Sequence, residues 1–164
     1  MKYIKTLVTI LFLIVSIINA QEKIKITSST VVVVKTQQSI QGKNLMEGQE
    51  LIWAVAADLK VNGKVVIKSG TPVIARVTQI ENAGMVGQGG ALSISFESTK
   101  AVDGSVVNLS GSLNSKGESS VGTSVAVGVV LCPLALLMKG KDGSFPAGTQ
   151  SRAMTLGETE VIVQ

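Results

Sequence analysis

Apolar and polar residues alternate over short stretches along most of this chain, which is the pattern of β-strands with one buried face. The clearest stretch is 91–97, where Leu92, Ile94 and Phe96 alternate with serine and glutamate. The same reasoning predicts eight short strands, at 24–34, 49–56, 64–68, 71–80, 91–97, 106–109, 145–154 and 160–163. The inward-facing side chains that we expect to form the core are Trp53, Val55, Val73, Val77, Leu92, Ile94 and Phe96.

Turn signals separate the predicted strands. Asparagine or an acidic residue precedes glycine at 47–48, 62–63, 103–104 and 142–143, and such pairs are typical of tight hairpin turns. The glycine-rich stretch 84–90 precedes an alternating strand and not a helix, so we interpret it as a mobile loop or hairpin crossing rather than a phosphate-binding loop. The sequence therefore predicts an all-β domain, a barrel or sandwich of about eight short strands.

One long stretch departs from this pattern. Residues 119–138 contain no charge, and a helix of that length would span about 30 Å, the hydrocarbon thickness of a bilayer. Pro133 would kink such a helix or divide it in two. We predict one apolar helical or hairpin insertion here, either buried against the sheet or inserted into a membrane or an apolar partner. The residues expected to make a membrane or partner contact are Val121, Gly122, Val125, Gly128, Val129, Leu131, Leu134 and Leu137.

The first residues have the layout of a secretory signal peptide. Two lysines precede an apolar core at 7–18, and Ala20 offers a small residue before the expected cleavage site. This core is short for a membrane span. We therefore predict that residues 1–20 are a signal peptide and that 21–164 form a single β-domain. The expected location is the periplasm, the outer membrane or the extracellular space.

The composition restricts the chemistry that the chain can perform. It has no histidine and one cysteine, Cys132, which excludes Ser-His-Asp triads, Cys-His dyads, histidine metal sites and zinc sites built on several thiolates. Carboxylate chemistry stays open, with Asp58, Asp103 and Asp142 as candidate acids. We predict no catalytic residue, no cofactor and no metal site. The net charge of +4 is small and the cations are scattered, which does not favour nucleic-acid binding.

A family resemblance adds to this interpretation. Residues 65–111 include VVIKSGTPVIARVTQ, a glycine-rich loop, ALSISFEST and VDGSVVNLSG, and KGKDGSFPAGT follows towards the C-terminus. These stretches resemble small exported bacterial β-domains of unassigned function. Their order more remotely resembles the β-barrel domain of the outer-membrane channel subunit of type IV secretion and conjugation systems. In that family a helical hairpin between barrel strands crosses the outer membrane, and residues 119–138 occupy a comparable place. The resemblance implies a barrel fold, and it assigns no binding residues.

Together these features predict an exported, non-catalytic structural or interaction module of the envelope or the secreted fraction, with an unidentified ligand. A first alternative is an oligomeric, membrane-associated channel or secretion component that inserts through 119–138. A second alternative is a carboxylate-dependent hydrolase, which requires two of its acids to converge within about 5–10 Å. The expected partners are an envelope membrane, another protein, or further copies of the chain.

Overall fold

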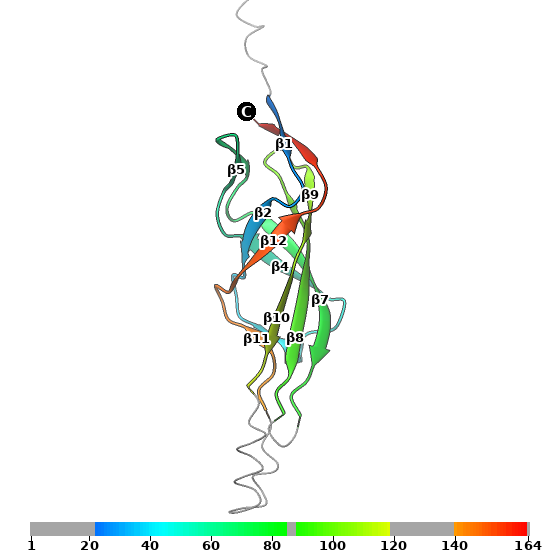
Figure 1. The fold of residues 1–164 in the computed structure, drawn as a ribbon. Coiled ribbons are helices and arrows are strands. Elements are labelled where there is room, and N and C mark those ends of the chain that lie inside the picture. The colour runs from blue at the N-terminus through cyan, green and yellow to red at the C-terminus, as the bar shows by residue number, and fades with distance from the viewer. Residues whose placement is uncertain (1–21, 85–87, 119–139, 164) are drawn as a thin grey trace, which may run out of the picture.

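The computed structural model describes residues 22–84, 88–118 and 140–163, and this part of the chain is all-β (Figure 1). Its one helical element is a 3₁₀ turn, η1 (Gly42–Asn44). The strands are β1 (Glu22–Ile26), β2 (Val31–Lys35), β3 (Ile40–Gln41), β4 (Glu50–Val55), β5 (Leu59–Val61), β6 (Lys64–Ile67), β7 (Pro72–Glu81), β8 (Ala91–Lys100), β9 (Val106–Ser110), β10 (Ser112–Lys116), β11 (Ser144–Phe145), β12 (Gln150–Thr155) and β13 (Thr159–Val163). The predicted all-β class is confirmed.

Six antiparallel strands close into a barrel, so the structure adopts one of the two predicted architectures. Their order around the barrel is β8, β7, β4, β2, β12 and β9. The barrel closes because β9 pairs with β8, with Ser98 opposite Asn108. Each of the six strands therefore has a neighbour on both sides, which removes the free edges that an open sheet would present.

One long stretch of chain joins the barrel to a ribbon below it. Only Gly111 separates β9 from β10, and the two pair in succession with β8, with a register shift of one residue at Gly111. A Cβ on Gly111 would lie 3.0 Å from the carbonyl oxygen of Arg152, so glycine allows β12 to pass close to this position. The ribbon of β7, β8 and β10 continues below the barrel, and the short pair β3–β11 lies beside it (Figure 1).

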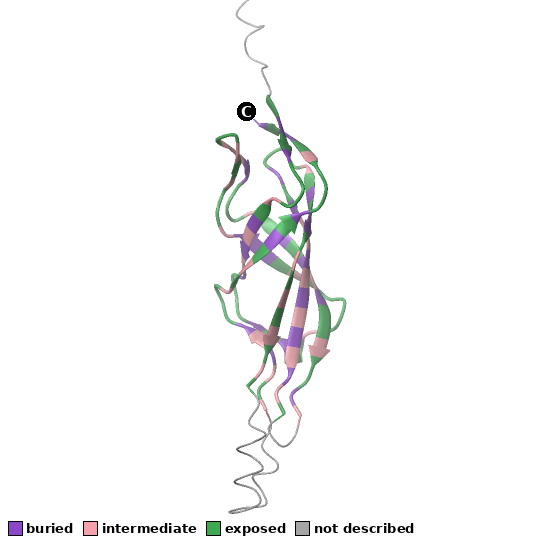
Figure 2. Ribbon diagram, in the orientation of Figure 1, coloured by how far each residue is buried: buried purple, intermediate pink, exposed green. Residues whose placement is uncertain are grey.

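Buried and exposed residues alternate along the barrel strands (Figure 2), and almost all of the buried ones are apolar, so they form the core. Every residue predicted to form the core is at most 2% exposed, so this prediction is confirmed. Trp53 contacts Phe96 and Phe145 edge to face, with ring centroids 5.2 and 5.9 Å apart. The indole N–H of Trp53 has no hydrogen-bond acceptor within the described residues, a cost that the large buried area of the ring offsets. A six-stranded barrel is narrow enough to be filled in this way, so it is a packed core and not a pore.

The predicted number of about eight strands is too low, because the described residues form thirteen and two of the predicted strands are each broken. Stretch 24–34 contains β1 and β2, separated by a turn in which Ser29 has a φ of 64°. Stretch 145–154 contains β11 and β12, separated by a turn at Gly148 with a φ of 82°. In both places the chain leaves one sheet for another, since β1 pairs with β13 and β11 pairs with β3 while β2 and β12 form barrel wall.

Three of the four predicted turns are confirmed, at 47–48, 62–63 and 103–104. Asn62 and Gly63 both have positive φ, 52° and 79°, as the two-residue loop between β5 and β6 requires. The fourth prediction, a turn at 142–143, is wrong. Gly143 lies in irregular backbone immediately before β11, where a Cβ would lie 2.5 Å from the backbone nitrogen of Leu92. This glycine is required for close approach and not for a turn.

Several predicted segments lie outside the described residues. They are the signal peptide at 1–20, the apolar insertion at 119–138 and positions 85–87 of the glycine-rich stretch. The described part of that stretch belongs to the hairpin connection between β7 and β8, as predicted. Among the residues that the structure does describe, no helix has the length and hydropathy needed to cross a bilayer.

Candidate functional site

Glycine backbone builds the end of the molecule from which residues 119–139 depart. A Cβ on Gly117 would lie 1.7 Å from the carbonyl oxygen of Lys141, and one on Gly140 would lie 2.2 Å from that of Gln88. The N–H of Gly117 donates to the carbonyl of Gly90 at 2.7 Å, so neighbouring stretches are also hydrogen bonded. Only glycine permits backbones to approach this closely. We refer to Gly89, Gly90, Gly117, Gly140 and Gly143, which share this property, as the glycine junction.

The two ends of the apolar insertion leave the glycine junction side by side. The backbone N–H of Lys141 donates to the carbonyl of Glu118 at 3.3 Å, and their side chains form an ion pair. The hydrogen bond from Lys141 lowers the pKa of the Glu118 carboxyl below its ordinary value. Glu118 and Lys141, on either side of stretch 119–139, therefore lie together at the end of the β7–β8–β10 ribbon, away from β1 and β13 (Figure 1). The predicted contact residues of this stretch all lie outside the described residues: Val121, Gly122, Val125, Gly128, Val129, Leu131, Leu134 and Leu137.

Nothing in the alternating strand pattern predicts the glycine junction, because its members come from stretches far apart in the sequence. One signal was available in the residues themselves. Gly117 and Gly140 flank the uncharged run on its two sides. Glycines placed where a segment leaves a sheet indicate close approach of two backbones as readily as they indicate turns.

The three candidate acids of the hydrolase alternative bind backbone groups in different loops. Asp58 accepts a hydrogen bond from the N–H of Ser69 at 2.7 Å, which lowers the pKa of its carboxyl. Asp142 accepts from the N–H of Ala83 at 2.8 Å, beside the glycine junction. Asp103 lies in the β8–β9 turn at the opposite end of the barrel (Figure 1). Each carboxylate holds a loop in place, and within the described ranges no three acidic or cysteine side chains gather as metal ligands.

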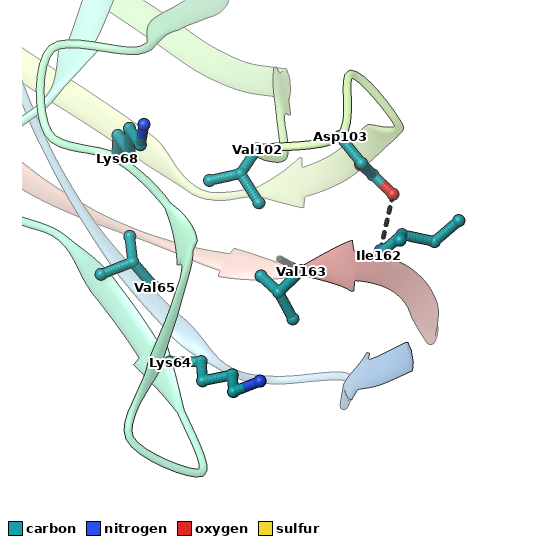
Figure 3. A pocket seen from close by; sticks show the side chains of 7 residues that line it. All are labelled: Lys64, Val65, Lys68, Val102, Asp103, Ile162 and Val163. Atoms are coloured by element: carbon teal, nitrogen blue, oxygen red, sulfur yellow. Dashed lines mark hydrogen bonds between the residues drawn. The ribbon is translucent and has the colours of Figure 1, made fainter. Parts of the chain in front are cut away.

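At the end opposite the glycine junction, the hairpin β5–β6 and the ribbon β1–β13 leave a cavity of about 760 Å³ between them (Figure 3). Asp103 accepts a hydrogen bond from the N–H of Ile162 at 2.8 Å across its mouth, and Lys64 binds Glu22 at 2.7 Å. Lys68 also lines the cavity, and it forms no ion pair among the described residues, so the cavity keeps charged side chains of both signs. The lining residues are Lys64, Val65, Lys68, Val102, Asp103, Ile162 and Val163.

Comparison with known proteins adds no assignment to this geometry. No protein-family model matches the chain, and a search of curated proteins finds no match either.

Proposed function

We propose that this protein is an exported, non-catalytic module of the bacterial envelope or secreted fraction, which holds the apolar segment 119–138 against a membrane or a protein partner. The observation that carries the proposal is that both ends of this segment leave the molecule together at the glycine junction, where the ribbon of β7, β8 and β10 that extends from the closed barrel ends. Because the junction has no room for side chains, the base of the segment is held at one position. The packed barrel interior suits a rigid support rather than a container.

Other features support the remaining parts of the proposal. The layout of residues 1–20 supports export. Asp58, Asp103 and Asp142 each accept backbone hydrogen bonds that stabilise loops, which gives these acids a structural role. The absence of histidine from the sequence removes the commonest general base.

An oligomeric, membrane-associated channel or secretion component is the second candidate. Ile52, Val106 and Met154 are exposed on the barrel wall although they belong to strands, and such apolar side chains favour contact between copies. Since Trp53 and its neighbours fill the inside of the barrel, any passage would have to lie between copies and not within one.

The test compares the full-length chain with a variant in which the dipeptide Asn-Gly replaces residues 119–138. Glu118 and Lys141 are hydrogen bonded, so a short loop can join them without moving the barrel. In detergent-free fractionation we expect the full-length protein to sediment with membranes or with a partner, and the variant to be soluble and folded. Circular dichroism measures whether the variant is folded.

The opposite result would contradict the proposal. A full-length protein that is soluble and monomeric, together with a variant that unfolds, would make segment 119–138 part of the domain core. Duplication of Asn62-Gly63 serves as the control, because it changes an exposed turn at the other end of the barrel by the same dipeptide. This control should fractionate like the parent chain.

A further inference from the structure

The cavity between hairpin β5–β6 and ribbon β1–β13 is bordered by two strand edges that lack a partner strand. Within the described residues, β6 pairs only with β5, and β13 pairs only with β1. Val65 of β6 and Ile162 of β13 both line the cavity. A strand edge without a partner exposes backbone N–H and C=O groups, which can pair with another extended segment.

The register of the hairpin shows which way the backbone of Val65 faces. Residues 62–63 form a two-residue loop, so Val61 and Lys64 are the hydrogen-bonded pair that closes it. Hydrogen-bonded and non-hydrogen-bonded pairs alternate in an antiparallel ladder, so the next pair, Val65 with Lys60, is not hydrogen bonded. The N–H and C=O of Val65 therefore point away from β5, at the edge of β6 that borders the cavity.

The edge of β13 can be placed in the same way. The N–H of Ile162 donates to the carboxylate of Asp103 at 2.8 Å, so it points away from β1. In an antiparallel pair the N–H and C=O of one residue point to the same side, so the carbonyl of Ile162 also points away from β1. A side chain already takes the N–H of this edge, and the carbonyl is left for another donor.

The β8–β9 turn binds both edges at one side of the cavity. The N–H of Val102 donates to the carbonyl of Val66 in β6 at 3.0 Å, and the next residue, Asp103, binds Ile162 in β13. Two consecutive residues thus contact both edges, as a strand between them would. Because Val102 and Asp103 line the cavity together with both edges, an extended segment in the cavity would lie within reach of both.

The cavity also has apolar walls. Val65, Val102 and Val163 come from three different elements and border the same space, which favours apolar side chains in a ligand (Figure 3). Its volume of about 760 Å³ lies within the range of known ligand sites, roughly 300–1,000 Å³.

The charged groups at the cavity favour an acidic ligand. The carboxylate of Asp103 accepts hydrogen bonds from the N–H and the hydroxyl of Ser105 and from the β13 edge, and Lys64 is paired with Glu22. Lys68 has no ion-pair partner within the described residues. It is therefore the charged group of the cavity that is left to bind a carboxylate from outside.

We propose that this cavity binds an extended peptide segment of a partner protein, which adds as a strand between β6 and β13 and carries acidic side chains beside apolar ones. The backbone of the segment pairs with Val65 and donates to the carbonyl of Ile162, and an acidic side chain binds Lys68. The inference goes beyond the proposed function, because it concerns the end opposite the glycine junction and holds whatever segment 119–138 contacts.

A synthetic peptide tests this inference on the full-length protein. The probe is fluorescently labelled acetyl-Val-Glu-Val-Glu-Val-amide, whose binding is followed by fluorescence anisotropy at low salt. We expect saturable binding, together with slower amide exchange at Val65. A second peptide, with its central valine N-methylated, keeps the side chains but loses one N–H. Since a strand edge lies on either side of the bound peptide, this change should weaken binding at least about tenfold.

Two lysines provide matched variants of the protein. Lys60 and Lys68 both act on the Asp58 carboxylate through their charge, but only Lys68 lines the cavity. Both side chains are exposed, so neither substitution should unfold the domain. Lys68→Gln should weaken binding of the probe about threefold at low salt, whereas Lys60→Gln should leave it unchanged.

Three results would overturn the inference. If the probe did not bind at concentrations up to about 1 mM, the lysines at the cavity would instead protect its strand edges from pairing. Equal binding of the N-methylated peptide would show that no strand is added. Equal binding by Lys68→Gln and Lys60→Gln would show that the cavity does not select acidic side chains.

Discussion

The two ends of the barrel hold their loops in different ways. At one end the glycine junction packs backbone on backbone, and the N–H of Gly42 adds a hydrogen bond to the carbonyl of Gly143 at 2.9 Å. At the other end the hairpin β5–β6 and the ribbon β1–β13 stand apart around a cavity of about 760 Å³. There the connections are mostly exposed side-chain contacts, such as Lys64 with Glu22.

This difference shows that the fold fixes the base of segment 119–138 more firmly than it fixes the hairpins at the opposite end. An exposed ion pair contributes at most about 1 kcal/mol, so each hairpin can lose one and remain folded. A glycine whose Cβ would overlap backbone cannot be replaced unless a strand moves. The two ends should therefore respond differently to substitution.

The largest effect is expected from Trp53→Ala, which removes the side chain that links the barrel core to the junction end. Trp53 contacts Phe96 within the barrel and Phe145 of β11, so its loss leaves a cavity beneath β11. We expect the free energy of unfolding in urea to fall by about 3–5 kcal/mol, with faster amide exchange at the glycine junction. Ile52, the exposed residue next to Trp53 on β4, provides the control. Ile52→Ala should change the free energy of unfolding by less than about 0.5 kcal/mol. If Trp53→Ala accelerated amide exchange only at the end that holds the cavity, the proposed difference between the two ends would be wrong.

The second-largest loss of stability is expected when a glycine at the junction end is replaced by alanine, and a glycine at the opposite end serves as the comparison. In Gly143→Ala the new Cβ would lie 2.5 Å from the backbone nitrogen of Leu92 and must displace it, so we expect a loss of about 3 kcal/mol. In Gly63→Ala, at the tip of β5–β6, no atom lies within 4 Å, and the cost is that of a φ of 79°, about 1 kcal/mol. Thermal unfolding of both variants measures which of the two substitutions costs more stability. Equal losses at the two positions would show that the junction is no tighter than an ordinary turn.

The alternation of apolar and polar residues predicts the barrel core because alternation and burial both arise from one face of each strand. Leu92, Ile94 and Phe96 are predicted correctly for this reason. The prediction fails where a strand-like run contains a change of sheet. Residues 28–30 are serine and threonine, which also occur in strands, so composition alone does not separate β1 from β2.

Neighbouring apolar residues on the outside of the barrel wall cannot be predicted from the strand pattern, because they depend on which strands are neighbours. Ile52 and Ile74 each look like an ordinary strand residue, and only the β4–β7 register places them side by side. The glycine junction depends in the same way on a meeting of distant stretches. A local pattern indicates which face of a strand is buried, but it does not indicate which exposed apolar residues of different strands become neighbours.

The smallest effect is a pH dependence at the cavity end. Partial burial raises the pKa of the Asp103 carboxyl, but hydrogen bonds from Ser105 and from the N–H of Ile162 outweigh it, so the pKa lies below its ordinary value. An ordinary aspartate in the unfolded chain has a pKa of about 3.9. The carboxylate therefore stabilises the fold above about pH 4, and this contribution is lost as the pH falls through the lower folded-state pKa.

Asp103→Asn removes this titration and separates the charge of the side chain from its shape. Because the carboxylate is exposed and screened by solvent, we expect the variant to be less stable than the parent at pH 7 by under about 1 kcal/mol. The difference should shrink towards zero as the pH falls from about 4 to about 2, since the parent then becomes neutral too. Urea denaturation of both proteins across this range measures it, and Ser105→Ala should show a weaker form of the same trend. A difference that stays constant with pH would mean that Asp103 joins the β8–β9 turn to β13 through geometry alone, and the cavity end would then lack a charge-dependent contact between these elements.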